Sequence, residues 1–153
     1  MKRWPAKSRA DTTTFGGLTR GELMSRVRSS GNVTTELRLI SLMRAARLGG
    51  WRRKWRLLGN PDFVFLKAKV AIFVDGCFWH GHNCRRNLTP RKNVIAWRNK
   101  IEGNRRRDRY NRRDLRKRGW KVLIIWECTL TKTPTNIVRR IERALHTPRN
   151  TIP

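Results

Sequence analysis

The chain has 153 residues, which is enough for one domain with a buried core but too short for two independent ones. Thirty-seven Lys and Arg outnumber ten Asp and Glu, so the formal net charge is +27. A charge of this size favours a polyanionic partner, because counterion release from a phosphate backbone supplies affinity; an anionic membrane surface or ribosomal RNA would satisfy it equally.

Hydropathy and cysteine content indicate the cellular compartment of the protein. No apolar run approaches the ~20 residues that a membrane-spanning helix needs, so we expect no membrane insertion. The basic first eleven residues lack the apolar segment of a secretory signal. The three cysteines are an odd number, which argues against a disulfide framework and for a reducing compartment. We therefore expect a cytoplasmic protein.

The first third of the chain predicts an arm, a helix and an edge strand. Residues 1–21 are polar and basic and predict a flexible arm, whereas residues 22–153 predict a single domain. Thr34 and Thr35 before Glu36 predict a helix start, because hydroxyls cap free amides and an acid suits the first turn. That helix should end at Gly49–Gly50 and bury a stripe of Leu37, Ile40, Leu42, Met43 and Leu48.

The remainder predicts an α/β fold, with a central sheet flanked by helices. Residues 51–58 predict an edge strand, and Gly59-Asn60-Pro61 predicts a turn. Residues 62–66 and 69–74 predict a hairpin whose second strand is apolar on both faces, as in a central strand. A long helix over 91–118, a second buried strand over 120–126 and a last helix from Thr133–Pro134 complete the pattern.

Thiols and an imidazole cluster in the loop after the predicted central strand. Cys77, His82 and Cys84 have the spacing C-x4-H-x-C, and Cys128 follows the next strand. Four nitrogen and sulfur ligands are typical of a structural zinc site, which would fasten the loop to the end of that strand. The alternative is a set of small buried thiols, and the spacing, which is not that of a standard zinc finger, leaves both interpretations open.

Carboxylates occur at two neighbouring points of the predicted hairpin. Asp62 follows Pro61 at the start of one strand, and Val74–Asp75 ends the next, so a paired hairpin would bring Asp62 beside that end. A carboxylate and a backbone carbonyl are hard ligands for Mg²⁺, which takes phosphate oxygens and polarises a scissile phosphate. The alternative is ordinary turn chemistry, which Pro-Asp and Asp-Gly pairs alone favour.

One face of the predicted long helix combines apolar residues with two polar ones. Its members recur at a period of about 3.6 and are Trp97, Ile101, Asn104, Asp108 and Leu115. On this face Asp108 could orient an imidazole such as His80 and raise its basicity, which is the support that a general base needs. A salt bridge between Asp108 and a neighbouring arginine is the simpler alternative.

Large aromatic rings accompany the basic residues. Phe78 and Trp79 lie in a polar, glycine-containing loop, and Trp97 lies on a helix coated with arginine. Rings in such surroundings can wedge between base steps and unstack them. The alternative is that Trp97 packs with Ile101 and Leu115 on the sheet.

A series of motifs in this order resembles the very-short-patch repair (Vsr-type) DNA mismatch endonucleases. The resemblance runs from about Met24 to Cys128, and its last two motifs are the most specific. The motifs are Met24-Ser25-Arg26-Val27-Arg28, Thr35-Glu36-Leu37, Pro61-Asp62-Phe63-Val64-Phe65, Gly76-Cys77-Phe78-Trp79-His80, Trp97-x3-Ile101-x2-Asn104-x3-Asp108 and Gly119-Trp120-Lys121-Val122-Leu123-Ile124-Ile125-Trp126-Glu127-Cys128.

The resemblance implies a restriction-endonuclease-like fold, with a mixed central sheet flanked by helices and a structural zinc site. It implies an enzyme that uses Mg²⁺ to nick double-stranded DNA 5′ to the thymine of a T·G mismatch, as left by deamination of 5-methylcytosine. It further implies a monomer in the bacterial cytoplasm that associates with the nucleoid and works beside other repair proteins.

The resemblance also assigns roles to individual residues. Asp62 would bind Mg²⁺ with the carbonyl of Val74, and Glu36 would assist at the metal-bound water. His80 would activate the attacking water with support from Asp108. The zinc ligands would be Cys77, His82, Cys84 and Cys128, and the DNA contacts would come from Phe78, Trp79, Trp97, Asn104, Met24 and Arg26.

The chain departs from the family pattern at two places. Val74–Asp75 stands where the best-known members carry Thr-His; a carbonyl ligand tolerates Val, and Asp75 is predicted as a second, catalytic metal ligand. The loop before Glu36 is one residue longer, with Gly31. Two other functions stay open: a less selective nicking or restriction-type nuclease, and a non-catalytic zinc-containing nucleic-acid-binding protein. The co-occurrence of Asp62, His80 and Asp108 argues against the non-catalytic binding protein.

Overall fold

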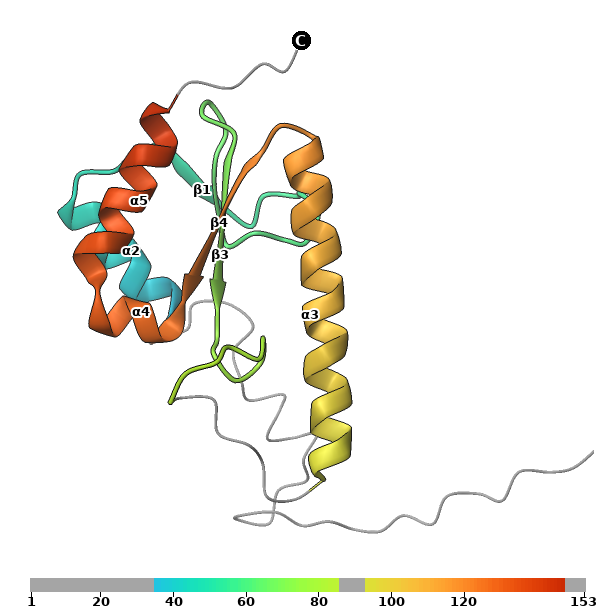
Figure 1. Ribbon diagram of the computed structural model, residues 1–153. Coiled ribbons are helices and arrows are strands. Elements are labelled where there is room, and N and C mark those ends of the chain that lie inside the picture. Colours follow the sequence, from blue (N-terminus) through green and yellow to red (C-terminus); the bar gives the residue numbers. More distant parts are fainter. Residues whose placement is uncertain (1–34, 86–92, 148–153) are drawn as a thin grey trace, which may run out of the picture. The chain divides into compact units, whose positions relative to one another are not determined.

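One mixed sheet with helices on both faces forms the described part of the chain, residues 35–85 and 93–147 of a computed structural model (Figure 1). The strand order is β1-β2-β3-β4, with antiparallel pairing up to β3 and parallel pairing of β3 with β4. The strands are β1 (Trp51–Arg53), β2 (Phe63–Phe65), β3 (Val70–Asp75) and β4 (Lys121–Trp126). The predicted arm, Gly31, Met24 and Arg26 lie outside the described residues.

Helices cover the two faces unequally. Of the described helices, α3 (Val94–Lys117) lies along one face, and the other face carries α2 (Glu36–Ala45), α4 (Glu127–Lys132) and α5 (Pro134–His146) (Figure 1). Alternate residues of β2 and β3 therefore enter two different cores, because successive strand side chains point to opposite faces. Phe63 and Ile72 pack with Leu39 and Ile141, whereas Val64 and Phe73 belong to the core that includes Leu115 of α3.

The predicted hairpin, central strand and long helix are confirmed. Phe65 pairs with Val70 across the turn of residues 66–69, and β3 lies between β2 and β4 with nearly every side chain buried. Gly119 follows α3 with a φ of +76°, a left-handed conformation that glycine adopts without a steric penalty. The predicted edge strand is also confirmed, although β1 is shorter than residues 51–58.

Four details of the prediction are wrong. The first helix ends at Ala45, before the predicted end at Gly49–Gly50. Leu37 is 41% exposed, and Leu39 takes its place in the buried stripe of α2. In β4 only Ile125 is buried, because β4 is the outermost strand among the described residues. The short helix α4 was not predicted. No helix among the described residues is long and apolar enough to cross a membrane.

Candidate functional site

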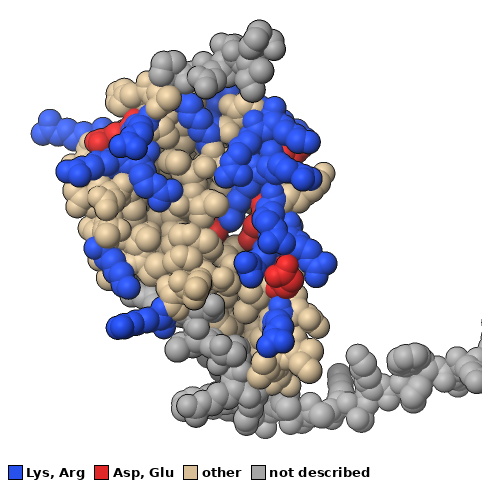
Figure 2. Space-filling view, in the orientation of Figure 1, with Lys and Arg blue, Asp and Glu red and all other residues tan. Residues whose placement is uncertain are grey.

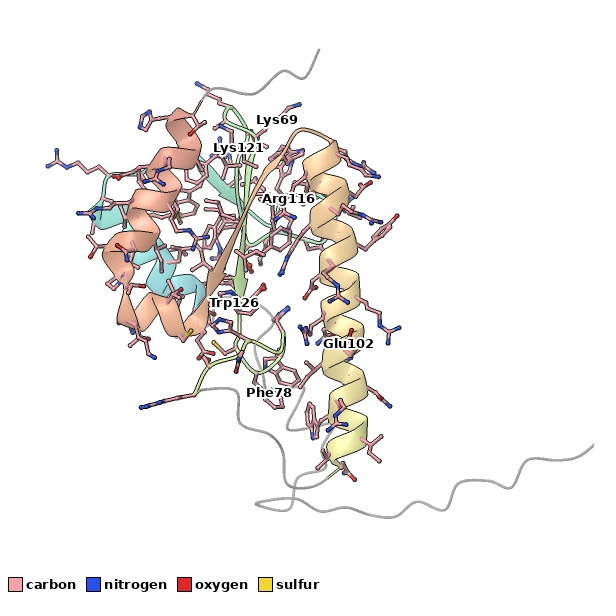
Figure 3. The ribbon with its side chains drawn as sticks, in the orientation of Figure 1. Lys69, Phe78, Glu102, Arg116, Lys121 and Trp126 are labelled. Carbon is pink, nitrogen blue, oxygen red and sulfur yellow. The ribbon has the colours of Figure 1, made fainter. Side chains whose placement is uncertain are left out.

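The carboxyl ends of β3 and β4 lie side by side at one edge of the sheet, and the candidate site lies at this edge. Asp75 pairs with Trp126, so both parallel strands end at the same level. The chain continues from β3 into residues 76–85, here called the ligand loop, and from β4 directly into α4. His82 of the ligand loop stacks on the Trp126 ring, with 4.2 Å between centroids and 9° between planes. Phe78 and Trp126 lie at this common end (Figure 3).

The structure brings together the four predicted nitrogen and sulfur ligands. One ligand atom from each of Cys77, His82, Cys84 and Cys128 lies within 4.8 Å of all the others. The Sγ atoms of Cys77 and Cys128 are 3.5 and 3.4 Å from His82 Nδ1. A tetrahedral ion with bonds of ~2.3 Å to sulfur and ~2.0 Å to nitrogen requires ligand separations of roughly 3.5–3.8 Å. The cluster can therefore hold a metal ion.

Backbone contacts and burial fit the same interpretation. The His82 N–H donates to the Cys77 carbonyl at 2.9 Å, and the Cys77 N–H donates to the Glu127 carboxylate at 3.4 Å, which joins the ligand loop to α4. Burial raises the pKa of the Cys77 thiol to about 12, and the neighbouring thiols of Cys84 and Cys128 add to the rise. A bound cation would favour the thiolate that metal coordination requires.

The hairpin places Asp62 beside the end of β3. The Val74 N–H donates to Asp62 Oδ2 at 2.6 Å, across the antiparallel pair of β2 and β3. Burial raises the pKa of Asp62 from 3.8 to about 6; the Val74 hydrogen bond opposes this rise, and the nearby charges of Glu36 and Asp75 add to it. Desolvated, crowded carboxylate oxygens are hard donors of the kind that a divalent cation stabilises, so Asp62 and the Val74 carbonyl suit such an ion. The Glu36 carboxylate is already paired with Arg53.

His80 and Asp108 form a direct pair between the ligand loop and α3. His80 Nδ1 lies 2.5 Å from Asp108 Oδ2. The predicted alternative, an arginine partner, is also present, because Arg107 Nη2 lies 3.6 Å from Asp108 Oδ1. With Nδ1 engaged by the carboxylate, the other ring nitrogen, Nε2, is the one that can exchange a proton with a water molecule.

Two contacts fix the ligand loop against α3. Asn104 Nδ2 donates to the Trp79 carbonyl at 3.0 Å, and the Asn104 side chain is buried. Gly81 has a φ of +63°, and a Cβ atom at Gly81 would come within 2.8 Å of Ile101 Cγ2. The close approach therefore depends on glycine. In this structure Asn104 anchors the loop, and its predicted DNA contact stays a prediction.

The aromatic residues form a cluster of their own. Ring centroids lie 5.2 Å apart for Phe78–Trp79, 5.2 Å for Phe78–Trp97 and 5.7 Å for Trp79–Trp97, all in edge contacts. Trp97 stands near the beginning of α3, far along the helix from Leu115, which packs on the sheet. The predicted alternative, in which Trp97 packs with Ile101 and Leu115 on the sheet, is therefore wrong.

Sequence reasoning missed Arg112, which pairs with Asp75. Arg112 Nη2 donates to Asp75 Oδ2 at 2.5 Å, and both side chains are buried. The guanidinium lies over the Phe73 ring, 5.2 Å from its centroid. The helical period could have identified Arg112, because this residue follows Asp108 by one turn on the inward face of α3. In the sequence, however, Arg112 resembles the exposed arginines around it.

Positive charge surrounds the site. Lys and Arg side chains gather along α3 (Figure 2), where those of Arg106 and Arg109 are 73% and 64% exposed. A cavity of about 330 Å³ lies between the ligand loop and α3, and its lining includes His80, Asp108 and Arg112. These surroundings suit a polyanion, although α3 also carries Glu102 among its exposed arginines.

Comparison with known proteins gives consistent matches. The sequence model of the family described as "DNA mismatch endonuclease Vsr" matches residues 12–86, which include Asp62, His80 and three of the four clustered ligands. The type II nicking enzyme V.XorIIP of Xanthomonas oryzae pv. oryzae is 38% identical over 109 residues, 71% of this chain and 79% of its own. The DNA mismatch endonuclease Vsr of Escherichia coli is 41% identical over 95 residues, 62% of this chain and 61% of its own.

The metal cluster predicts that His82→Ala releases one metal ion per chain. Loss of one of four ligands should also lower the thermal unfolding midpoint by roughly 10 °C, because the ion joins the ligand loop to α4. Elemental analysis of the purified protein and a thermal melt measure both effects. The exposed His146 provides the control, since His146→Ala should keep the ion. Equal metal content in the two variants would contradict the cluster as a metal site.

The raised pKa of Asp62 predicts a pH-dependent stability. The folded protein binds an extra proton between pH 3.8 and about 6, so its stability falls as pH rises through that range. Without added divalent ions, Asp62→Asn should be more stable than the unchanged protein at pH 7.5, by up to about 3 kcal/mol, with little gain at pH 4. Urea titrations at the two pH values measure this.

The matched control for this prediction is Asp114→Asn, which removes a carboxylate from a pair with the exposed Arg118. Its effect should stay below about 1 kcal/mol at both pH values. A gain from Asp62→Asn that is as large at pH 4 as at pH 7.5 would show that burial of the charged carboxylate is not the cause.

Proposed function

This chain belongs to the Vsr family of DNA mismatch endonucleases, and from that membership we propose that it nicks one strand of double-stranded DNA 5′ to the thymine of a T·G mismatch. As a member it is a DNA endonuclease. The observation that supports the proposal most is the His80–Asp108 pair, held 2.5 Å apart close to Asp75 and the end of β3. Hydrolysis of a phosphodiester needs a general base close to a metal ion, and His80 lies close to the proposed metal ligands at the end of β3.

We propose that Mg²⁺ binds at Asp62 and the carbonyl of Val74, with Glu36 assisting through water. The support is the donor chemistry, since buried and mutually repelling carboxylates favour a cation that prefers oxygen ligands and retains several waters. When bound there, the ion supplies positive charge for the scissile phosphate and the leaving oxygen. Asp62 would bind the ion, and the hydrogen bond from the Val74 N–H orients the Asp62 carboxylate.

His80 is proposed as the general base. Asp108 accepts a hydrogen bond from Nδ1, which leaves Nε2 unprotonated and able to take a proton from the attacking water. The contact also stabilises the imidazolium that forms after the transfer. In-line attack on the phosphorus would leave a 5′-phosphate and a 3′-hydroxyl end.

The clustered thiols and imidazole are proposed to hold zinc in a structural role. Three sulfur ligands and one nitrogen ligand leave no open position, which is typical of a structural zinc ion. The ion would fasten the loop that carries His80 and the aromatic residues to α4. Phe78, Trp79 and Trp97 are proposed to insert beside the mismatch, and Asn104, Met24 and Arg26 to contact DNA around it.

Exposed arginines on α3 supply contacts for the phosphate backbone, which release counterions and steer DNA to the site. We further propose that the protein works on the bacterial nucleoid, which the bacterial origin of its relatives supports, and that it works as a monomer beside other repair proteins. A second candidate, nicking without a required mismatch, has the support of the relative from Xanthomonas oryzae, whose name is that of a type II nicking enzyme. Family membership removes support from the non-catalytic alternative.

The proposal predicts the products from two labelled duplexes that differ only in one base. With Mg²⁺, the duplex containing a T·G mismatch should be nicked once, 5′ to the thymine, and the matched T·A duplex should stay intact. Asp62→Ala should lower the rate at least ~10³-fold because the metal charge is lost, and His80→Ala by ~10²–10⁴-fold because the base is lost. A gel of the labelled strand measures each rate.

Asp114→Ala is the matched control, since its carboxylate lies in an exposed pair with Arg118 and should be dispensable. Equal cutting of both duplexes would overturn the mismatch requirement and favour the less selective nuclease. Tight binding of both duplexes without cutting, across several flanking sequences, would contradict the proposed reaction itself.

A further inference from the structure

We propose that Arg112 is a positioning residue that holds Asp75 as an ion pair and keeps this carboxylate out of the shell of the catalytic metal ion. The inference rests on the metal centre proposed above and decides which acids take part in it. It also reverses the expectation from sequence that Asp75 is a second metal ligand.

Arg112 of α3 forms an ion pair with Asp75 at the end of β3. Asp75 is 3% exposed, and its Oδ2 atom receives Arg112 Nη2 at 2.5 Å. The Arg112 side chain is 10% exposed and lies over Phe73, two residues before Asp75 on the same face of β3. A buried carboxylate requires a compensating cation, and here the protein itself provides one.

Asp62 has the opposite surroundings. Among the described residues no Lys or Arg forms an ion pair with Asp62, and its carboxylate is stabilised by the backbone N–H of Val74. Asp75 is near enough to add to the rise in the pKa of Asp62. The buried Asp75 already has a cation, whereas the neighbouring, half-buried Asp62 has none among the described residues. A divalent ion gains most by binding the acid without one.

Arg112 also reaches the second acid of the site. Its Nη2 atom lies 4.0 Å from Asp108 Oδ2, and His80 Nδ1 lies 4.0 Å from Asp75 Oδ2. The guanidinium and the imidazole thus both stand between the same two carboxylates. Among the described residues the buried Nε atom of Arg112 has no hydrogen-bond partner, and the closest contacts of the guanidinium are with Asp75 and Phe73. Arg112 and Asp75 position each other, and Asp108 remains available to His80.

The deciding experiment measures Mn²⁺ binding to the zinc-loaded protein by electron paramagnetic resonance of the free ion. Asp75→Asn keeps an acceptor for Arg112 but removes the charge, and Asp62→Asn does the same at the proposed ligand. We expect Asp62→Asn to weaken Mn²⁺ binding at least tenfold and Asp75→Asn to change it less than fivefold. A fivefold or larger weakening in Asp75→Asn, with the same in Asp62→Asn, would overturn the inference.

The failure of the proposed metal centre would look different, because Mn²⁺ binding would then be unchanged in Asp62→Asn. The part played by Arg112 is tested with Arg112→Met, which releases Asp75. Mn²⁺ should bind at least fivefold tighter to this variant, and the gain should disappear in the double variant Asp75→Asn/Arg112→Met. A gain that persists in the double variant would show that released Asp75 is not its source.

Arg112→Met leaves a buried carboxylate without a partner, and its unfolding midpoint should fall by roughly 10 °C, with partial recovery in the double variant. If the single variant does not fold, Asp75→Asn still decides whether Asp75 binds the metal ion, and a fivefold or larger weakening there would overturn the inference. The exposed pair of Arg118 and Asp114 is the matched control, and Arg118→Met should alter neither the Mn²⁺ affinity nor, by more than about 3 °C, the midpoint.

Discussion

The parallel pairing of β3 with β4 is the constraint on which the rest of the structure depends. Because Asp75 is opposite Trp126, both strands stop at one level, and the segments that follow them emerge side by side. One segment is the ligand loop with His80 and His82, and the other is α4 with Cys128. A shift in this register would separate the metal ligands and move His80 away from Asp108. Ile72 and Ile125 are fully buried in the core beneath the site, and their packing stabilises this register.

A single face of α3 supplies the other half of the site. Asn104, Asp108 and Arg112 succeed one another along the helix and contact the ligand loop or the end of β3. Leu115 anchors the same face in the core over Val64 and Ala71, which gives the polar residues a rigid support. The opposite face carries exposed arginines. One helix thereby combines the acid that orients the base with the charge that attracts a polyanion, and solvent-exposed pairs add little to its stability.

Much of this could be predicted from the sequence, because the signals were local. The hairpin of residues 62–74 placed Asp62 beside Val74, and the spacing of cysteines and His82 indicated a common ligand set. Three features required the tertiary structure. Arg112 looked like any arginine of a basic helix until Asp75 was placed beneath it. The apolar run of β4 does not distinguish an edge strand from a central one. The six-residue α4 continues from a strand without a break, and burial of Cys128 and Leu130 rather than helix propensity stabilises it.

Two metal sites of different chemistry are expected at one end of one sheet. Anomalous diffraction from crystals of the zinc-loaded protein soaked in Mn²⁺ tests this directly, because the two elements scatter differently at their absorption edges. We expect a zinc peak among Cys77, His82, Cys84 and Cys128, and a separate manganese peak bound to the Asp62 carboxylate and the Val74 carbonyl, with Asp75 still paired to Arg112. A manganese peak bound to Asp75, or none near Asp62, would contradict the proposed catalytic metal centre.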